Sequence, residues 1–218
     1  MALAELHRRL AVDATVTIRL VEAGHWPARR TRDTIEGAGF DAETDPDGDA
    51  VRCRRLLTLP DTVGAGMKML VCGLNPSVYA AEQGVGFARP GNRFWPAALR
   101  AGIVTVDRDP DHALQVHGVG MTDMVKRSTP RAAELDDVEY QEGFARLERL
   151  VDWLAPAIVC VVGLAGWRAV TDRKAGAGMQ VRTVGGRPVY VMPSTSGLNA
   201  HAQIDDLTEH LRSAWAGA

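Results

Sequence analysis

Apolar and polar residues alternate in the last two thirds of the chain with the periods of helices and buried strands. The clearest helix is predicted over residues 138–154, where apolar side chains recur every three or four positions: Phe144, Leu147, Leu150, Val151 and Leu154. Pro156 ends this segment, and residues 157–162 (AIVCVV) form an apolar run of strand length. A helix followed at once by a fully apolar strand is typical of parallel α/β sheets.

Further segments continue this alternation. Strands are predicted over residues 68–72 and 119–124, and helices over residues 92–101, 163–171 and 203–215. Residues 181–184 and 188–192 flank Gly185-Gly186, which favours a hairpin turn. Strand–helix alternation indicates a short, mostly parallel sheet with helices on both faces, which is a three-layer α/β/α fold.

Residues 1–65 have a different pattern and are interpreted as a partly helical N-terminal extension to a main domain over residues 66–218. An amphipathic helix is expected over residues 2–23, although the β-branched run at 12–18 disfavours it, and a second short helix over 31–37. An acidic loop (41–50), a strand (51–59) and a connector (60–66) follow. Two roles stay open for the extension: a cap packed on the main domain, or a helix pair that contacts a partner.

Composition restricts the class of protein only weakly. The formal net charge is -2, so any contact with a polyanion requires a local basic face. The three cysteines are far apart in sequence, and two stand in apolar runs, which disfavours a disulfide framework and suggests a cytoplasmic protein. We find no secretory signal and no apolar stretch of 18 residues, so no membrane partner is expected.

Candidate chemistry lies in two loops that follow predicted strands. Residues 73–77 (GLNPS) come after the first strand of the main domain, and residues 192–198 (MPSTSGL) come after the last. Ligand sites of parallel α/β sheets form at the carboxyl ends of the strands. Small polar residues and prolines let a backbone approach a planar base or a phosphate closely. The same residue types also dominate ordinary turns, so composition leaves both readings open.

Four segments in this order resemble the mismatch-specific uracil/thymine-DNA glycosylases, of the uracil-DNA glycosylase superfamily. They are VCGLNPS (71–77), GFARPGNRFW (86–95), GMTDMVKRST (120–129) and MPSTSGL (192–198). Bacterial members of that family read GINPG and FAHPANRFW at the first two, and animal members read MPSSSAR at the last. The resemblance covers roughly residues 67–215, and four matching segments are far more specific than one.

The resemblance implies a function and a set of site residues. A member of this family is a monofunctional DNA-repair glycosylase that hydrolyses the N-glycosidic bond of uracil, and in some cases of thymine or modified pyrimidines, in mismatched double-stranded DNA. Asn75 matches the catalytic asparagine that orients a water, and Phe87 matches the aromatic that stacks on the flipped base. The implied base pocket adds Gly73, Leu74, Pro76, Ser77, Asn92 and Ser194. Gly197 and Leu198 match the wedge that enters the duplex, and Ser196 is grouped with them among the wedge and DNA-backbone contacts. Neither cofactor nor metal is implied, and a monomer is expected.

Two departures from the family pattern leave a second reading open. Ser77 stands where the family usually has glycine, and Ala200 stands where bacterial members have arginine. A DNA- or base-binding protein of the same fold, with little or no cleavage, therefore remains the alternative.

Basic residues near these motifs are candidates for a phosphate-binding face that the net charge conceals: Arg89, Arg93, Arg100, Lys126, Arg127 and Arg131. Lys126 and Arg127 follow a predicted strand end, which places them on the same side of the sheet as the two loops, so contacts with the DNA backbone are expected from both. Scattered surface charge is the alternative for the others.

Overall fold

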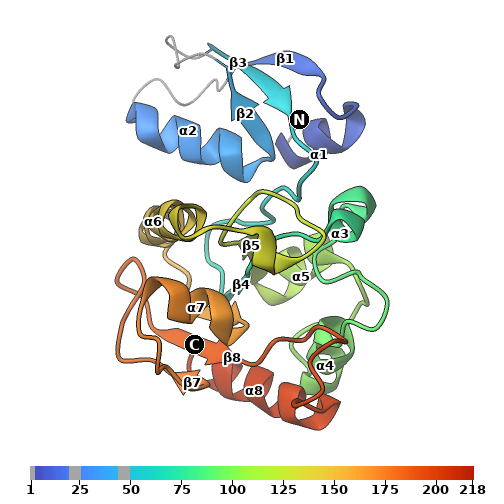
Figure 1. Cartoon of the computed structure of the whole chain (residues 1–218), viewed down its shortest axis with the longest axis vertical. Coiled ribbons are helices and arrows are strands. Elements are labelled where there is room, and N and C mark those ends of the chain that lie inside the picture. The colour runs from blue at the N-terminus through green and yellow to red at the C-terminus, as the bar shows by residue number, and fades with distance from the viewer. Residues whose placement is uncertain (1–2, 20–25, 44–49) are drawn as a thin grey trace.

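The computed structural model describes residues 3–19, 26–43 and 50–218, which form a small N-terminal unit and a larger α/β domain. Figure 1 shows the N-terminal unit, in blue and cyan, as a lobe beside the larger domain. Within the described residues, no helix is both long and apolar enough to cross a membrane.

The N-terminal unit is a three-stranded antiparallel sheet with two helices. Its elements are α1 (Leu3–Arg9), β1 (Thr15–Arg19), α2 (Ala28–Gly37), β2 (Phe40–Ala42) and β3 (Ala50–Arg55), with strand order β1-β3-β2. Ile18, Ile35, Phe40, Val51 and Cys53 are buried at its centre. Of the helix expected over residues 2–23, only Leu3–Arg9 is helical, and the rest of the prediction is wrong where the β-branched run forms β1 instead. Residues 2 and 20–23 of that prediction, and residues 44–49 of the expected acidic loop, lie outside the described residues.

Helix α2 docks on α6 (Asp137–Leu154) of the larger domain through charged and aromatic contacts. The guanidinium of Arg30 lies over the rings of Trp26 and Trp153, at 4.3 and 3.7 Å from their centroids. One helical turn further, Arg149 donates two hydrogen bonds of 2.6 and 2.8 Å to the Asp33 carboxylate. These contacts pack the N-terminal unit against the main domain.

The larger domain is built on a five-stranded sheet of order β5-β4-β6-β8-β7. Four strands are parallel: β4 (Met69–Gly73), β5 (Val119–Asp123), β6 (Ile158–Val162) and β8 (Val189–Met192). The two-residue strand β7 (Gly178–Met179) pairs antiparallel with β8 at the edge. The prediction of a short, mostly parallel sheet is therefore confirmed.

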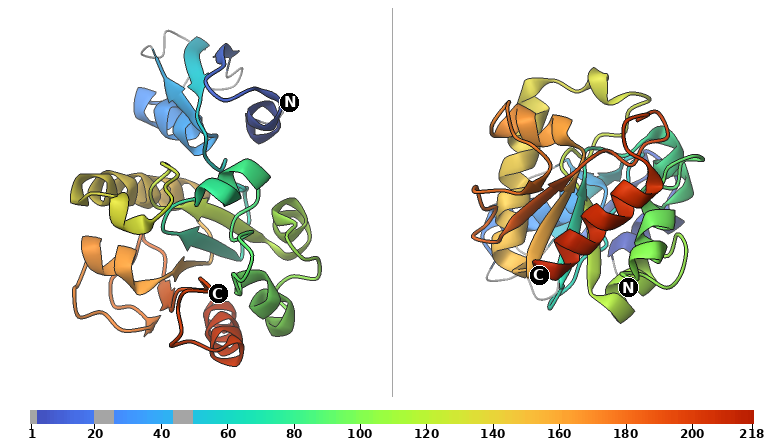
Figure 2. Two further views of the ribbon diagram at one scale, coloured as in Figure 1. Left: turned by 45° about the vertical axis from the view of Figure 1, so that its right-hand side comes forward. Right: turned by 90° about the horizontal axis from the view of Figure 1, so that it is seen from below.

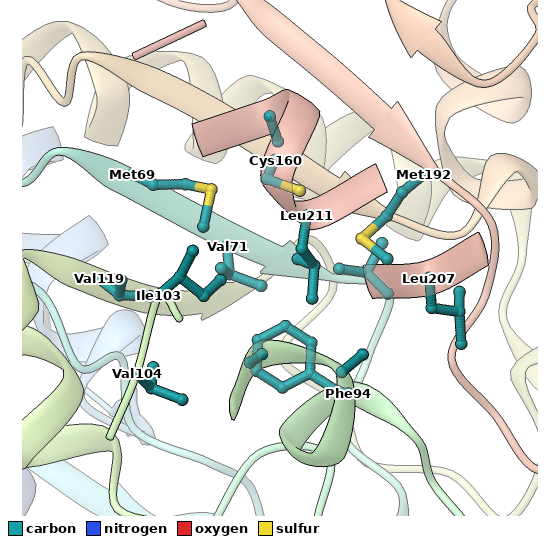
Figure 3. Packing of buried hydrophobic residues seen from close by; sticks show 14 of the residues in the cluster. Met69, Val71, Phe94, Ile103, Val104, Val119, Cys160, Met192, Leu207 and Leu211 are labelled. Atoms are coloured by element: carbon teal, nitrogen blue, oxygen red, sulfur yellow. The ribbon is translucent and has the colours of Figure 1, made fainter. Parts of the chain in front are cut away.

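Helices cover both faces of this sheet, which makes the three layers α/β/α (Figure 2). Side chains of β4 alternate between the two faces: Met69 and Val71 enter one core, and Leu70 and Cys72 enter the other. Helices α4 (Phe94–Ala101) and α8 (Ile204–Ala216) close the first core, in which Phe94 packs near Leu207 and Leu211 (Figure 3). Helices α6 and α7 (Leu164–Val170) close the second.

Several element boundaries differ from the sequence-based expectation. Gly185 and Gly186 form the expected turn with positive φ angles of 51° and 74°, but β8 pairs with residues 178–179 rather than with 181–184. Two short helices were not predicted: α3 (Val78–Gln83) and α5 (Pro110–His117). A short 3-10 helix, Ala132–Glu134, precedes α6.

Candidate active site

The loop after β4 is held along its length by the segment after β5. The amides of Met124 and Val125 donate to the carbonyls of Gly73 and Leu74, each at 2.9 Å, and the amide of Thr129 donates to the carbonyl of Pro76 at 3.1 Å. Parallel pairing thus continues past the end of the sheet and fixes residues 73–77 as a rigid platform at its carboxyl edge.

Asn75 is oriented by this pairing. Its Nδ2 donates to the Arg127 carbonyl at 3.0 Å, to the Thr129 hydroxyl at 2.7 Å and more weakly to the Pro76 carbonyl at 3.3 Å. Carbonyl oxygens only accept hydrogen bonds, so the nitrogen of the carboxamide must face them. The hydrogen bonds of the described residues include none to Oδ1, which therefore points away with its acceptor capacity open, in a residue that is half-buried.

The other residues of this loop have mainly structural contacts. Leu74 packs against Gly166 of α7, where an added Cβ would collide with its side chain. The hydroxyl of Ser77 accepts from the Ala80 amide at 3.2 Å and caps α3, with an ordinary φ of -71°. Serine thus stands at this position without backbone strain, and its hydroxyl is engaged by α3 rather than free for the base contact expected from the resemblance.

Phe87 lies beside this platform in a strained backbone conformation. Its φ is 59°, a region that bulky side chains rarely adopt. One face of its ring stacks on Phe94, with centroids 4.3 Å apart and planes at 23°. A Cβ built on Gly73 would lie 3.5 Å from Phe87 Cζ, so the ring tip reaches over the end of β4. The structure therefore presents a half-buried aromatic ring next to the loop that carries Asn75.

The second loop, residues 192–198, is held by Arg93. The Arg93 backbone amide donates to the Thr195 carbonyl at 2.9 Å, and its guanidinium donates to the carbonyls of Ser196, Asn199 and Ala202. Arg93 is therefore a support of this loop and not a free surface charge. Asn92 has a local contact instead, because its Oδ1 accepts from the Phe94 amide at 2.9 Å just before α4.

The tip of the second loop projects a leucine into solvent. The Leu198 side chain is 85% exposed, which is unusual for a large apolar residue in an otherwise packed domain. Gly197 precedes it and lies so close to Gly91 that an added Cβ would be 2.8 Å from the Gly91 carbonyl oxygen. The hydroxyl of Ser196 accepts from the Leu198 amide at 3.3 Å. Rigid backbone packing thus supports an exposed apolar tip.

The two loops lie on either side of β6. Strand order β4-β6-β8 places the carboxyl ends of β4 and β8 one strand apart, at the same edge of the sheet. The amide of Gly163, which follows β6, donates to the Met192 carbonyl at 2.9 Å, and a Cβ on Gly163 would be 3.8 Å from Ser194 Cβ. Ser194 therefore packs against the Gly163 turn. Among the described residues, no hydrogen bond joins Ser194 to Asn75.

Lys126 lies in a position that is inconsistent with the expected contact to a DNA backbone. Its side chain is only 4% exposed, and Nζ donates to Asp61 Oδ1 at 2.8 Å. Arg146 donates to the other oxygen of the same carboxylate at 2.9 Å. Desolvation by burial raises the pKa of Asp61, but the charges and hydrogen bonds of Arg146 and Lys126 outweigh it and hold this pKa below its usual value. Lys126 thus neutralises a buried carboxylate of the connector.

Other candidates for a phosphate-binding face are also engaged within the protein. Arg127 is half-exposed and forms a two-pronged contact with Glu139, at 2.5 and 2.8 Å. Arg100 pairs with Asp205 at 3.0 Å, and Arg93 is committed to the second loop. Arg89 and Arg131 are exposed, and no side-chain partner is found for them among the described residues. Of the basic face expected from the sequence, Arg89, Arg131 and the solvent-exposed part of the Arg127 side chain therefore remain.

Asp123 is a candidate site residue that sequence reasoning missed. It is the last residue of β5, directly opposite Gly73 in the parallel register, and it shares a small hollow with Phe87 and Gly86. Its neighbours Lys126 and Arg127 were selected because they follow a strand end. The same rule applied to Asp123, which is nearer to that end, would have found it.

Two comparisons identify the class of protein that this fold and these loops define. The sequence model of the uracil DNA glycosylase superfamily matches residues 60–217. A solution NMR structure from Methanosarcina acetivorans, described as a "putative Uracil DNA glycosylase", is similar with a TM-score of 0.52 and 19% sequence identity. The match covers 73% of this chain and 96% of that chain. The likeness to that structure supports the three-layer fold. The chain belongs to the uracil DNA glycosylase superfamily.

Proposed function

We propose that this protein is a monofunctional DNA glycosylase that removes uracil from mismatched double-stranded DNA, with Asn75 as the residue that orients the attacking water. The observation that carries the proposal is the fixed Asn75 carboxamide, whose nitrogen is held by Arg127 and Thr129 while Oδ1 is left open. Superfamily membership supports glycosylase activity in general. The mismatch-specific assignment rests on the sequence motifs.

The chemistry suits a group that accepts a hydrogen bond but cannot act as a strong base. The C1′–N1 bond breaks first, and its electron pair leaves with the base, so the sugar acquires oxocarbenium character. A water held by Asn75 Oδ1 then forms the new C1′–O bond and loses its proton to solvent or to the departing base. Fixed geometry is the contribution of the protein to such a step, because an oriented water needs no further reorganisation.

A hydrolytic reaction without a lyase step agrees with the positions of the lysines. The chain has three: Lys68, Lys126 and Lys174. Lys126 is the one beside the platform, and its ammonium is buried against Asp61. Lys68 precedes β4, at the opposite end of the sheet, and its ammonium lies 3.9 Å from the centre of the Trp215 ring. Neither Lys126 nor Lys68 is therefore free on the site's side of the sheet to form a Schiff base with an abasic sugar.

Phe87 and Leu198 support the proposal that duplex DNA is the substrate. A base can be excised from a duplex only after it leaves the stack, and an apolar wedge offsets part of that cost of a few kcal/mol. Leu198 is exposed on a supported loop, and Phe87 offers an aromatic surface beside Asn75's loop. Of the basic residues named from the sequence, Arg89, Arg131 and the exposed part of Arg127 are available to phosphates within the described residues.

The alternative is a binder of damaged DNA with little cleavage, and one experiment separates the two. A duplex with a single G·U pair is incubated with the protein and treated with alkali, and binding is followed in parallel by gel shift. The glycosylase proposal predicts alkali-dependent strand breaks at the uracil, lost in Asn75→Ala and retained in Gln115→Ala, which removes an exposed carboxamide on α5. Binding without breaks by the unmodified protein would favour the binder.

A further inference from the structure

The segment after β5 is held from two sides, and successive residues alternate between them. On one side it faces the loop after β4, where the Arg127 carbonyl and the Thr129 hydroxyl both accept from Asn75 Nδ2. On the other side it faces residues 56–59, the junction segment, which lie between β3 and the connector. The odd-numbered residues of 125–129 thus contact the platform, and the even-numbered residues contact the junction segment.

Two hydroxyl groups make the contacts with the junction segment. The Thr58 hydroxyl donates to the Lys126 carbonyl, and the Ser128 hydroxyl donates to the Leu57 carbonyl at 2.6 Å. Each segment therefore supplies one donor and one acceptor. Thr58 is 1% exposed, so water does not compete for its hydrogen bond. The residue on each side of Arg127 is held in this way, which fixes the direction of the Arg127 carbonyl.

The junction segment is anchored at one end to the N-terminal unit. The Leu56 amide donates to the Gly39 carbonyl at 2.9 Å, and the Leu56 carbonyl accepts from His7 Nε2 at 3.0 Å. Burial lowers the pKa of His7 to about 4, so its ring is neutral near pH 7 and carries its proton on Nε2. Helix α1 and the turn before β2 thus hold the start of the junction segment.

At its other end the junction segment continues into the connector, which is fixed to both units. Thr62 and Met121 exchange two backbone hydrogen bonds of 2.9 and 2.8 Å in an antiparallel bridge on the outer edge of β5. The Asp61 amide donates to the Gly37 carbonyl of α2 at 2.6 Å. Residues 56–62 therefore run along β5 and the segment after it, and the N-terminal unit holds them there.

The junction segment lies outside the residues that match the superfamily model. Leu57 and Thr58 precede the matched residues, which are 60–217. The segment that orients Asn75 thus has part of its support from the N-terminal extension. Docking of the extension therefore contributes to the geometry of the site as well as to burial.

We propose that Thr58 and Ser128 are positioning residues for Asn75, and that the N-terminal extension supplies this support through its junction segment. The inference rests on the glycosylase function proposed above. The two hydroxyl groups act through the Arg127 carbonyl and Thr129, which are the acceptors that fix the Asn75 carboxamide. Small displacements of these acceptors turn the carboxamide away from the line along which it directs the water, and reactions of oriented groups are sensitive to such changes.

The test begins with variants of the two hydroxyl groups. Single-turnover rates are measured with excess protein on a duplex that carries 5-fluorouracil opposite guanine, because this better leaving group keeps slow variants measurable. We expect Thr58→Val and Ser128→Ala each to lower the rate about 5- to 20-fold. Thr58→Ser and Ser128→Thr retain a hydroxyl and should restore most of the rate. Binding of a duplex with uncleavable 2′-fluoro-2′-deoxyuridine should not change.

The decisive readout is the effect of the same two substitutions in the Asn75→Ala background. Once the carboxamide is gone there is nothing left to position, so Thr58→Val and Ser128→Ala should lower the residual rate by less than about twofold. A general packing defect would lower the rate by the same factor in both backgrounds and would overturn the inference. Thr208→Val is the matched control, because it removes a buried hydroxyl that donates to a backbone carbonyl at 2.8 Å on α8, and it should keep the unmodified rate.

The remaining outcomes separate this inference from the function on which it rests. Unchanged rates in Thr58→Val and Ser128→Ala, with Asn75→Ala impaired, would refute the positioning role and leave the glycosylase proposal standing. Release of no base by the unmodified protein would refute both. If Thr58→Val does not fold, Ser128→Ala answers the same question, because its hydroxyl is only half-buried and belongs to the other contact of the pair.

Discussion

Asn75 Nδ2 and the hydroxyl of Thr129 are 2.7 Å apart, although 54 positions separate them in sequence. The same hydroxyl donates to the Arg131 carbonyl at 2.9 Å, so Thr129 is itself held in place. This pair joins the loop after β4 to the segment after β5 and sets the direction of the Asn75 carboxamide. Thr129 is therefore a positioning residue for the water that Asn75 is proposed to bind.

Thr129→Val tests this relationship. Loss of the hydroxyl leaves one side of the Asn75 carboxamide without an acceptor, so the group turns more freely, and we expect a fall in single-turnover rate of about 10- to 100-fold. Binding of the G·U duplex should change little, because Thr129 is buried and does not face solvent. Thr129→Ser restores the hydroxyl and should recover most of the rate. Equal losses in Val and Ser would indicate a packing defect instead.

Arg93→Met tests the support of the second loop. Three backbone carbonyls lose a charged donor, and we expect a loss of about 2 kcal/mol in the free energy of unfolding together with faster proteolysis within residues 194–202. Duplex excision should fall because Leu198 is no longer held. Arg100→Met, which removes an exposed arginine of α4 paired with Asp205, is the matched control. An unchanged loop in Arg93→Met would contradict the role that the contacts assign.

Leu198→Ala tests the wedge. Its exposed side chain contributes little to the folded state, so the melting temperature should be unchanged. Without the wedge, part of the unstacking cost is no longer offset, and we expect about a 10-fold lower excision rate from duplex DNA. Uracil in single-stranded DNA needs no wedge, so its rate should be unaffected. Val181→Ala, at another fully exposed apolar position, controls for loss of surface area. Equal loss on both substrates would refute the wedge.

Helices and strands were predicted from the sequence more accurately in the main domain than in the N-terminal extension. Long runs such as residues 138–154 and 157–162 carry one period over many residues, and both became the expected elements. Residues 2–23 mix a helical apolar spacing with a β-branched run, and the pairing of β1 with β3 decides the outcome in favour of a strand. Helix α5 had its own signals, Asp109 as the cap and Pro110 at the first turn, which were not used.

The candidate site was found where the motifs are local and missed where partners are distant. Asn75, Phe87 and Leu198 stand in compact motifs. Lys126 is buried because it pairs with Asp61, which is 65 positions away in a connector without a recognisable pattern. The residues next to Lys126 in sequence therefore gave no indication of its burial. Arg93 was expected in a phosphate-binding face, and its support of the second loop had no local signal, because its three carbonyl partners lie more than 100 positions ahead.

The central claim is that Asn75 orients the water that replaces uracil at C1′, and its most direct measurement is the amount of free uracil released in one turnover. Excess protein is mixed with a G·U duplex, and the released base is quantified by mass spectrometry over time for the unmodified chain, Asn75→Ala and Gln115→Ala. The account predicts one uracil per duplex for the first and the last, and a rate lower by roughly 10³-fold for Asn75→Ala with the fold intact. Uracil release by Asn75→Ala at the rate of the unmodified protein would contradict it.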